Sequence, residues 1–205
     1  REGMKSVRAV VEAALEAGIE VLSLFAFSQE NWQRPAGEVS ALMALLEEYI
    51  AKEARELDEQ GVRVVFLGDL DRLGTAQRRA VDGVMALTAH NAKLVLNLFI
   101  SYGSRAELVR AARRIADEVA AGTLAPEQVD EAAISARLFT ADCPDPDLLI
   151  RTSGEMRLSN FLLWQLAYTE LHISPRLWPD FGRADLFQAI VDYQSRERRF
   201  GRVTA

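Results

Sequence analysis

The sequence predicts an α/β protein: a single domain over residues 1–205, built on a parallel sheet with helices on both faces. Helical periodicity alternates along the chain with short apolar runs. These runs are apolar on both sides, as in strands buried between two helical layers. The links between segments are short, which is typical of alternating helix–strand units. With 205 residues, 49% of them hydrophobic, the chain is long enough for one such core.

The first half of the chain alternates regularly between the two patterns. Apolar side chains recur at helical spacing over 4–17, and Gly18 is suited to end that helix. Residues 19–27 form an apolar run that predicts a buried strand. The next elements, in order, are a polar and aromatic loop over 28–35, a long amphipathic helix over 38–60 and a strand over 62–67.

The second half continues the alternation. Thr75 can cap a helix that reaches about residue 89, and a buried strand follows over 94–100. Ser104 and Glu107 have the spacing of a capping box at the start of the next helix. The last elements, in order, are that helix to about 120, a turn and short helix within 123–138, a loop over 140–147, a strand over 148–151, a helix over 161–167, a strand over 171–173 and a helix over 183–198.

Composition excludes several classes of partner and compartment. The net charge of −6 argues against a nucleic-acid partner, which would need a basic face. Cys143 is the single cysteine, so no internal disulfide is possible and a reducing compartment is favoured. No apolar run approaches the ~20 residues of a membrane span. We therefore expect a cytoplasmic protein.

Three polar loops follow strand ends, at 28–34, 101–105 and 152–160. Ligands of parallel sheets bind beyond the carboxyl ends of the strands, so we expect these loops to share one site. The first loop carries a hydroxyl, an acid, an amide, an indole and a guanidinium. The alternative for this loop is a capped turn in which Trp32 packs as a lid and Glu30 pairs with Arg34.

The run that begins at Arg151 holds a second set of anion-binding groups. Arg151 and Arg157 are forked donors suited to a diphosphate, and Ser159 adds a hydroxyl. Backbone N–H groups and the start of the helix predicted after the loop could add to the anion site. The alternative is a structural ion pair, for example between Arg157 and Glu155. An apolar, aromatic stretch follows, which suits a substrate that is half anion and half hydrocarbon.

Glu170 is an acid in an apolar neighbourhood just before a strand. An unpaired acid there would be costly, so a metal ion or an arginine must partner it, and spacing alone does not decide between them. An acid beside a diphosphate site commonly holds magnesium. The sequence contains no P-loop, no G-x-G-x-x-G pattern and no zinc spacing of Cys and His.

Two long blocks resemble the cis-prenyltransferase family, and within it the undecaprenyl diphosphate synthases. Residues 25–39 closely resemble the family block A-F-S-x-E-N-W-x-R-P-x-x-E-V, and 150–171 match its second signature nearly residue for residue. Residues 178–181 and 196–201 match the end of bacterial members. Asn97 and 102–105 resemble a further segment, in which Ser104 replaces the usual second glycine. The resemblance covers essentially the whole chain.

The resemblance implies a fold, a reaction and partners. The fold is a parallel-sheet domain with a hydrophobic tunnel. The reaction is the magnesium-dependent, sequential condensation of isopentenyl diphosphate onto an allylic starter, farnesyl diphosphate, giving a long polyprenyl diphosphate with cis double bonds. For a bacterial-looking member this product is undecaprenyl diphosphate, used in the lipid carrier of cell-wall synthesis. The family forms homodimers, and the lipid product implies transient contact with the inner face of the membrane.

The resemblance also implies roles for individual residues. Ser28 and Asn31 would assist deprotonation or orient the isopentenyl substrate, and Glu170 would bind magnesium. The residues that would bind the isopentenyl diphosphate are Arg151, Arg157 and Ser159. The residues that would shape the site and position substrates are Phe27, Glu30, Trp32 and Arg34. Arg199 and Gly201 match an Arg-x-Gly element that reaches the diphosphate site of the partner in the homodimer.

The family pattern begins upstream of Arg1. It opens with a strand ending in Asp-Gly-Asn-Gly-Arg-Trp-Ala, whose aspartate is the principal magnesium residue, and then reaches Gly-His-x-x-Gly. The chain resembles the family from the last glycine of that motif, Gly3. We expect either that the polypeptide continues upstream or, for a fragment, that it shows no turnover.

Two other functions compete with a prenyl-chain-elongating enzyme. The first is a non-catalytic partner subunit of the kind found in two-subunit relatives, which usually lacks the catalytic loop residues. The retention of Ser28, Asn31, Arg151, Arg157 and Glu170 favours the enzyme. The second is a generic phosphate-binding α/β domain, which would not explain the two long signatures.

Overall fold

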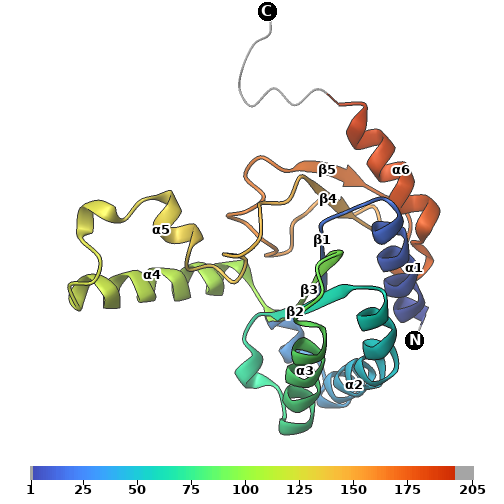
Figure 1. Cartoon of the computed structure of the whole chain (residues 1–205), viewed down its shortest axis with the longest axis horizontal. Coiled ribbons are helices and arrows are strands. Elements are labelled where there is room, and N and C mark those ends of the chain that lie inside the picture. Colours follow the sequence, from blue (N-terminus) through green and yellow to red (C-terminus); the bar gives the residue numbers. More distant parts are fainter. Residues whose placement is uncertain (1, 197–205) are drawn as a thin grey trace, which may run out of the picture. The chain divides into compact units, whose positions relative to one another are not determined.

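The computed structural model of the chain describes residues 2–196. The chain divides into two compact units: one contains the residues up to Ile19, Asp145–Ser159 and those from Leu163 onward, and the other contains Glu20–Pro144 and Asn160–Leu162. Each unit has a parallel sheet of its own (Figure 1). The parallel α/β class is therefore confirmed, although the described strands form two sheets. The single-domain organisation stays a prediction.

The larger unit is built on a three-stranded sheet in the order β1-β3-β2. Its strands are β1 (Val21–Ser28), β2 (Val62–Leu67) and β3 (Leu94–Tyr102), all parallel. Eight of the nine residues of β3 are buried, as expected for a central apolar strand. The helices of this unit are α2 (Ala36–Glu59), α3 (Thr75–Thr88), α4 (Ser104–Ala120) and α5 (Glu131–Ser135).

An aromatic cluster lies toward the carboxyl end of this sheet. Phe25 of β1 stacks on Phe161 with ring centroids 4.7 Å apart, and Phe99 of β3 meets Phe161 edge-on at 5.1 Å. Tyr102 contacts all three rings edge-on. Such offset and edge contacts are favourable beyond the area they bury. The cluster therefore fixes residues 160–162 at the end of β1 and β3, where the first candidate loop begins.

The smaller unit combines a two-stranded parallel sheet with two helices. Its elements are α1 (Glu2–Glu16), β4 (Leu148–Arg151), β5 (Glu170–Ile173) and α6 (Arg183–Gln194). The Ser6 hydroxyl donates to the carbonyl of Pro179 at 3.0 Å, and Arg183 of α6 pairs with Glu16 of α1 at 2.5 Å. These bonds tie α1 to the segment that leads into α6.

The predicted helix over 161–167 is wrong, because this segment consists of turns and bends. Ser159, Asn160 and Leu162 have φ values of 52°, 61° and 47°. These left-handed values are incompatible with the start of a right-handed helix. The apolar spacing of the segment instead reflects packing, since Phe161, Leu162 and Leu166 are buried.

The predicted caps of two helices also differ from the structure. Thr75 and Ser104 are the first helical residues rather than caps, which are Gly74 and Gly103. Glu107 does not reach back to form a capping box. Its carboxylate accepts from the Tyr102 hydroxyl at 2.6 Å and from the backbone N–H of Phe139 at 2.7 Å.

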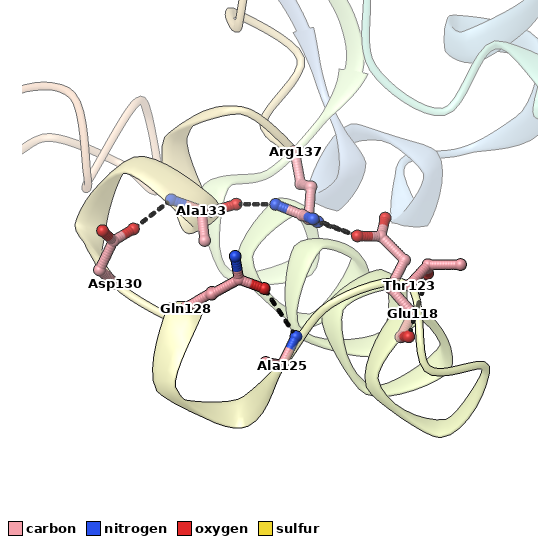
Figure 2. Close-up of polar contacts among 7 residues, drawn as sticks. All are labelled: Glu118, Thr123, Ala125, Gln128, Asp130, Ala133 and Arg137. Atoms are coloured by element: carbon pink, nitrogen blue, oxygen red, sulfur yellow. Dashed lines mark hydrogen bonds and ion pairs between the residues drawn. The ribbon is translucent and has the colours of Figure 1, made fainter.

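Helix α4 and the segment after it are joined by polar contacts (Figure 2). The guanidinium of Arg137 pairs with Glu118 near the end of α4 and also donates to the carbonyl of Ala133 at 2.5 Å. Asp130 caps α5 by accepting from the N–H of Ala133 at 2.8 Å. The Glu118–Arg137 pair therefore holds this connection to α4.

Candidate functional site

The first candidate loop follows β1 in the larger unit. A 3-10 turn, η1 (Gln29–Gln33), begins directly at the strand end and replaces the loop expected there. Asn31 stabilises this turn, because its Oδ1 accepts from the backbone N–H of Ser28 at 3.0 Å. The two residues predicted to be catalytic, Ser28 and Asn31, are therefore held together by a direct bond.

Trp32 is packed against the ends of two strands. Its Nε1 donates to Oγ of Ser101 at 2.9 Å, and its ring meets the buried Phe27 edge-on with centroids 5.0 Å apart. The guanidinium of Arg72 lies 4.8 Å from the centroid of the same ring, at the distance of a cation–π contact. Trp32 is thus packed, as in the alternative of a capped turn, and its neighbours include the cationic side chain of Arg72.

Glu30 and Arg34 do not pair with each other. Arg34 pairs with Glu38 at 2.8 Å, and Glu30 accepts from the side-chain amide of Asn160 at 2.9 Å. Burial raises the pKa of Glu30, but hydrogen bonds from Asn160, its own backbone N–H and Ser28 outweigh this effect. The pKa of Glu30 consequently lies below its ordinary value, so Glu30 is an anion at neutral pH.

The second candidate loop follows β4 in the smaller unit. Arg151 and Arg157 both pair with Glu155, the latter at 2.6 Å, so the ion pair proposed as the alternative is present. Arg151 also approaches Oγ of Ser159 at 3.5 Å. The loop thus gathers two guanidiniums and a hydroxyl around one carboxylate. Sequence reasoning treated Glu155 only as an ion-pair partner, and its central position was missed.

The backbone of this loop contributes less to anion binding than expected. The N–H groups of Ser153 and Gly154 donate to the carbonyls of Arg176 and Ser174 at 2.6 and 2.8 Å, so they are already occupied. No helix starts after the loop, and the predicted helix N-terminus is absent. Anion binding here therefore depends on side chains, above all on Arg157, whose side chain is 66% exposed.

Glu170, predicted as the metal ligand, has an arginine partner. Arg196 Nη1 donates to Oε2 of Glu170 at 2.8 Å, which is the second of the two partners considered for this acid. Residues 2–196 contain no cluster of three or more Asp, Glu, His or Cys side chains that could hold a metal ion. Magnesium often takes only one or two carboxylates and completes its shell with phosphates and water. Glu170 could therefore supply one carboxylate ligand to a magnesium ion.

Two of the predicted site residues, Arg199 and Gly201, lie outside the described residues. Sequence reasoning did not single out Asn160, whose side chain bonds Glu30 of the first loop. Its bond to Glu30 joins positions 130 residues apart, so no local pattern could reveal it.

Comparison with known proteins identifies the family. The model of the Prenyltransf family, described as "Putative undecaprenyl diphosphate synthase", matches residues 1–201. The chain belongs to this family. The cis-prenyltransferase resemblance seen in the sequence is confirmed, and with it the class of enzyme.

Individual relatives agree with this assignment. The prenyltransferase is 52% identical to an isoprenyl transferase of Heliobacterium mobile over 99% of the chain and 78% of that relative. It is 50% identical to a farnesyl-specific ditrans,polycis-undecaprenyl-diphosphate synthase of Xanthomonas axonopodis pv. citri over 100% of the chain and 80% of that relative. It also resembles the crystal structure of lavandulyl diphosphate synthase from Lavandula x intermedia in complex with dimethylallyl diphosphate (TM-score 0.95, 38% identity), over 98% of this chain and 86% of that one.

No helix within residues 2–196 of the prenyltransferase is both long and apolar enough to cross a bilayer.

Proposed function

We propose that this prenyltransferase elongates farnesyl diphosphate with successive isopentenyl diphosphate units to give undecaprenyl diphosphate. The observation that carries the proposal is the presence of two side-chain constellations at strand ends in a member of this family. One is the Ser28–Asn31 turn after β1, and the other is the Arg151–Arg157 loop after β4. The names of relatives about 50% identical over the full chain support the substrates and the product.

The guanidiniums of the second loop bind the diphosphate of the isopentenyl substrate. The Glu155 pair with Arg157 is largely exposed, and such pairs contribute about 0–1 kcal/mol. A charge-assisted bond to a substrate phosphate contributes roughly 1.5–3 kcal/mol. The substrate can therefore replace Glu155 at Arg157, while Arg151 and Ser159 hold its remaining oxygens.

The turn after β1 orients the reacting carbons. The C–O bond of the allylic diphosphate breaks, and its electron pair leaves with the diphosphate. The isopentenyl double bond attacks the allylic carbon, and a proton leaves C2 of the isopentenyl unit. Because Asn31 is fixed through its Oδ1, its side-chain N–H groups can donate to a substrate oxygen, and the Ser28 hydroxyl relays the departing proton to the leaving diphosphate. Phe27 and Trp32 shape the apolar side of the site.

Magnesium, when bound, would neutralise the charge of the leaving diphosphate, and Glu170 is the described residue that would hold it. Binding of the ion there would require Arg196 to release the Glu170 carboxylate. We further propose a hydrophobic tunnel for the growing chain, a homodimer, and a cytoplasmic enzyme that touches the inner membrane face when it releases its lipid.

Incorporation of radiolabelled isopentenyl diphosphate tests the function. With farnesyl diphosphate and Mg²⁺, the protein as the cell makes it is expected to yield a butanol-soluble product that migrates as undecaprenyl diphosphate. A protein that binds isopentenyl diphosphate yet incorporates none would instead be the non-catalytic partner subunit. Light scattering and liposome flotation with product test the dimer and the membrane contact, and a monomer or absence of flotation would refute them.

A further inference from the structure

Asn160 holds together three segments of the larger unit. Its side-chain Nδ2 donates to Oε1 of Glu30 at 2.9 Å, and its Oδ1 accepts from the backbone N–H of Arg105 at 2.9 Å. Its own carbonyl accepts from the N–H of Ser104 at 2.8 Å. The residue thus joins the turn η1 to the first turn of α4. None of the roles described above includes it.

The backbone on both sides of this contact is suited to it. Asn160 has φ 61°, a left-handed value that asparagine tolerates better than most residues. A Cβ on Gly103 would lie 2.7 Å from Nδ2 of Asn160 and 3.2 Å from Oε1 of Gln29. Only glycine lets the β3–α4 connection approach this closely without a shift. The contact therefore depends on specific residues in both segments.

The contacts of Asn160 with Glu30, Ser104 and Arg105, called the clamp below, lie next to the residues that orient the substrate. Glu30 lies directly before Asn31, whose Oδ1 in turn accepts from the N–H of Ser28. Glu30 is exposed and could otherwise move with the turn. We propose that Asn160 is a positioning residue for chain elongation: by fixing Glu30 against the start of α4, it sets the geometry of Ser28 and Asn31. This inference rests on the proposed function, because it assigns Asn160 to the same reaction.

The rest of the unit offers a matched control. Asn91 also donates from Nδ2 to a carboxylate at 2.9 Å, that of Asp58, and at 3.0 Å to the carbonyl of Val62. It joins the end of α2 to the start of β2, at the opposite ends of the strands from Ser28. In both Asn160→Asp and Asn91→Asp, an amide that donates to a carboxylate is replaced by a second carboxylate. The chemical change is the same, but only Asn160 contacts η1.

Steady-state kinetics and thermal unfolding of both variants test the proposal. Asn160→Asp is expected to lower kcat about 10- to 100-fold, since small displacements of positioning groups have effects of that order. Its KM for isopentenyl diphosphate should change less than threefold (on the order of 0.6 kcal/mol or less), because the diphosphate is held by other residues. Asn91→Asp should lower the unfolding temperature and leave kcat unchanged. Wild-type kcat in folded Asn160→Asp, or an equal loss in Asn91→Asp, would overturn the inference.

Amide hydrogen exchange provides a readout that does not need turnover. The Ser28 and Arg105 amides should exchange faster in Asn160→Gly, which keeps the left-handed backbone and removes the side chain, but not in Asn91→Asp. Unchanged exchange at Ser28 would show that the clamp does not reach the turn. If the wild type makes no polyprenyl product, the proposed function fails, and this exchange measurement still decides whether Asn160 positions the turn.

Discussion

The loops after β1 and β4 carry similar chemical groups but are held in different ways. In the loop after β1, Trp32 bonds Ser101 and Glu30 bonds Asn160, so these two side chains are fixed by residues 69 and 130 positions away. In the loop after β4, the two guanidiniums pair with Glu155 inside the loop itself. The first arrangement exists only in the folded unit, whereas the second is local.

This difference suggests a division of labour. Groups fixed by distant contacts are preorganised, which is what a reaction step requires of the residues that orient reacting atoms. Guanidiniums paired with a neighbouring acid are ready to exchange that acid for an external anion. We therefore expect changes after β4 to alter binding and changes around Glu30 to alter turnover. The following experiments test that contrast, from the largest expected effect to the smallest.

Removal of magnesium should have the largest effect. If the arginines alone could carry the leaving diphosphate, chelation would leave turnover intact. We expect EDTA to reduce isopentenyl diphosphate incorporation below detection and added Mg²⁺ to restore it, because two diphosphates bring more negative charge than two guanidiniums neutralise. Full activity after exhaustive chelation would remove magnesium, and Glu170 as its ligand, from the account.

Arg157→Ala tests the binding half of the comparison. Loss of one charge-assisted bond of about 1.5–3 kcal/mol should raise the KM for isopentenyl diphosphate roughly 10- to 150-fold. Arg78→Ala is the control, since Arg78 is also an exposed arginine in surface ion pairs, in its case with Asp71 and Asp82. An unchanged KM in Arg157→Ala would take Arg157 out of the site.

Glu155→Gln should have a smaller effect on the same loop. Glu155 occupies the two guanidiniums before substrate arrives, and an exposed pair of this kind contributes about 0–1 kcal/mol. Because the diphosphate no longer has to displace this acid in the variant, we expect the KM for isopentenyl diphosphate to fall up to about fivefold. A rise in KM would show that Glu155 arranges the binding groups rather than competing with the diphosphate.

The Glu118–Arg137 ion pair lies outside both loops in the sequence. We expect such a pair to contribute to the stability of the fold and not to substrate binding or turnover. The hydrogen bond from Arg137 lowers the pKa of Glu118 in the folded protein. A lowered folded pKa stabilises the fold above the unfolded pKa, and this contribution is lost as pH falls through the folded value. Glu118→Gln should therefore lower the unfolding temperature slightly at pH 7, the difference should vanish in acid, and kcat should not change. A difference that persists in acid would contradict this assignment.

Much of the fold could be predicted from the sequence because local periodicity determines it. The strand over 62–67 was predicted to the residue, and both candidate loops follow strands as expected. The helix over 161–167 was wrong because left-handed residues at 159, 160 and 162 prevent it, and apolar spacing carries no information about φ. The capping box at Ser104 was wrong because the buried Tyr102 hydroxyl and the Phe139 amide take the Glu107 carboxylate.

The candidate site was predictable in its residue types and not in its pairings. Ser28, Asn31, Arg151 and Arg157 were singled out because signatures preserve types at fixed spacing, and their roles stay predictions. The partner of Glu30 could not be found, because Asn160 reaches it only after residues 160–162 pack on the aromatic cluster. Pairing across 130 positions is a property of tertiary structure, and a single sequence does not report it.

The most direct test of this division of labour is isothermal titration calorimetry with isopentenyl diphosphate on the wild type, Arg157→Ala and Asn160→Asp, with kcat measured on the same samples. Arg157→Ala should weaken binding at least about tenfold, as expected for one lost charge-assisted bond. Asn160→Asp should bind within about threefold of the wild type, a difference on the order of 0.6 kcal/mol, while turning over far more slowly. Wild-type affinity in Arg157→Ala, or a binding loss in Asn160→Asp as large as that in Arg157→Ala, would contradict the account.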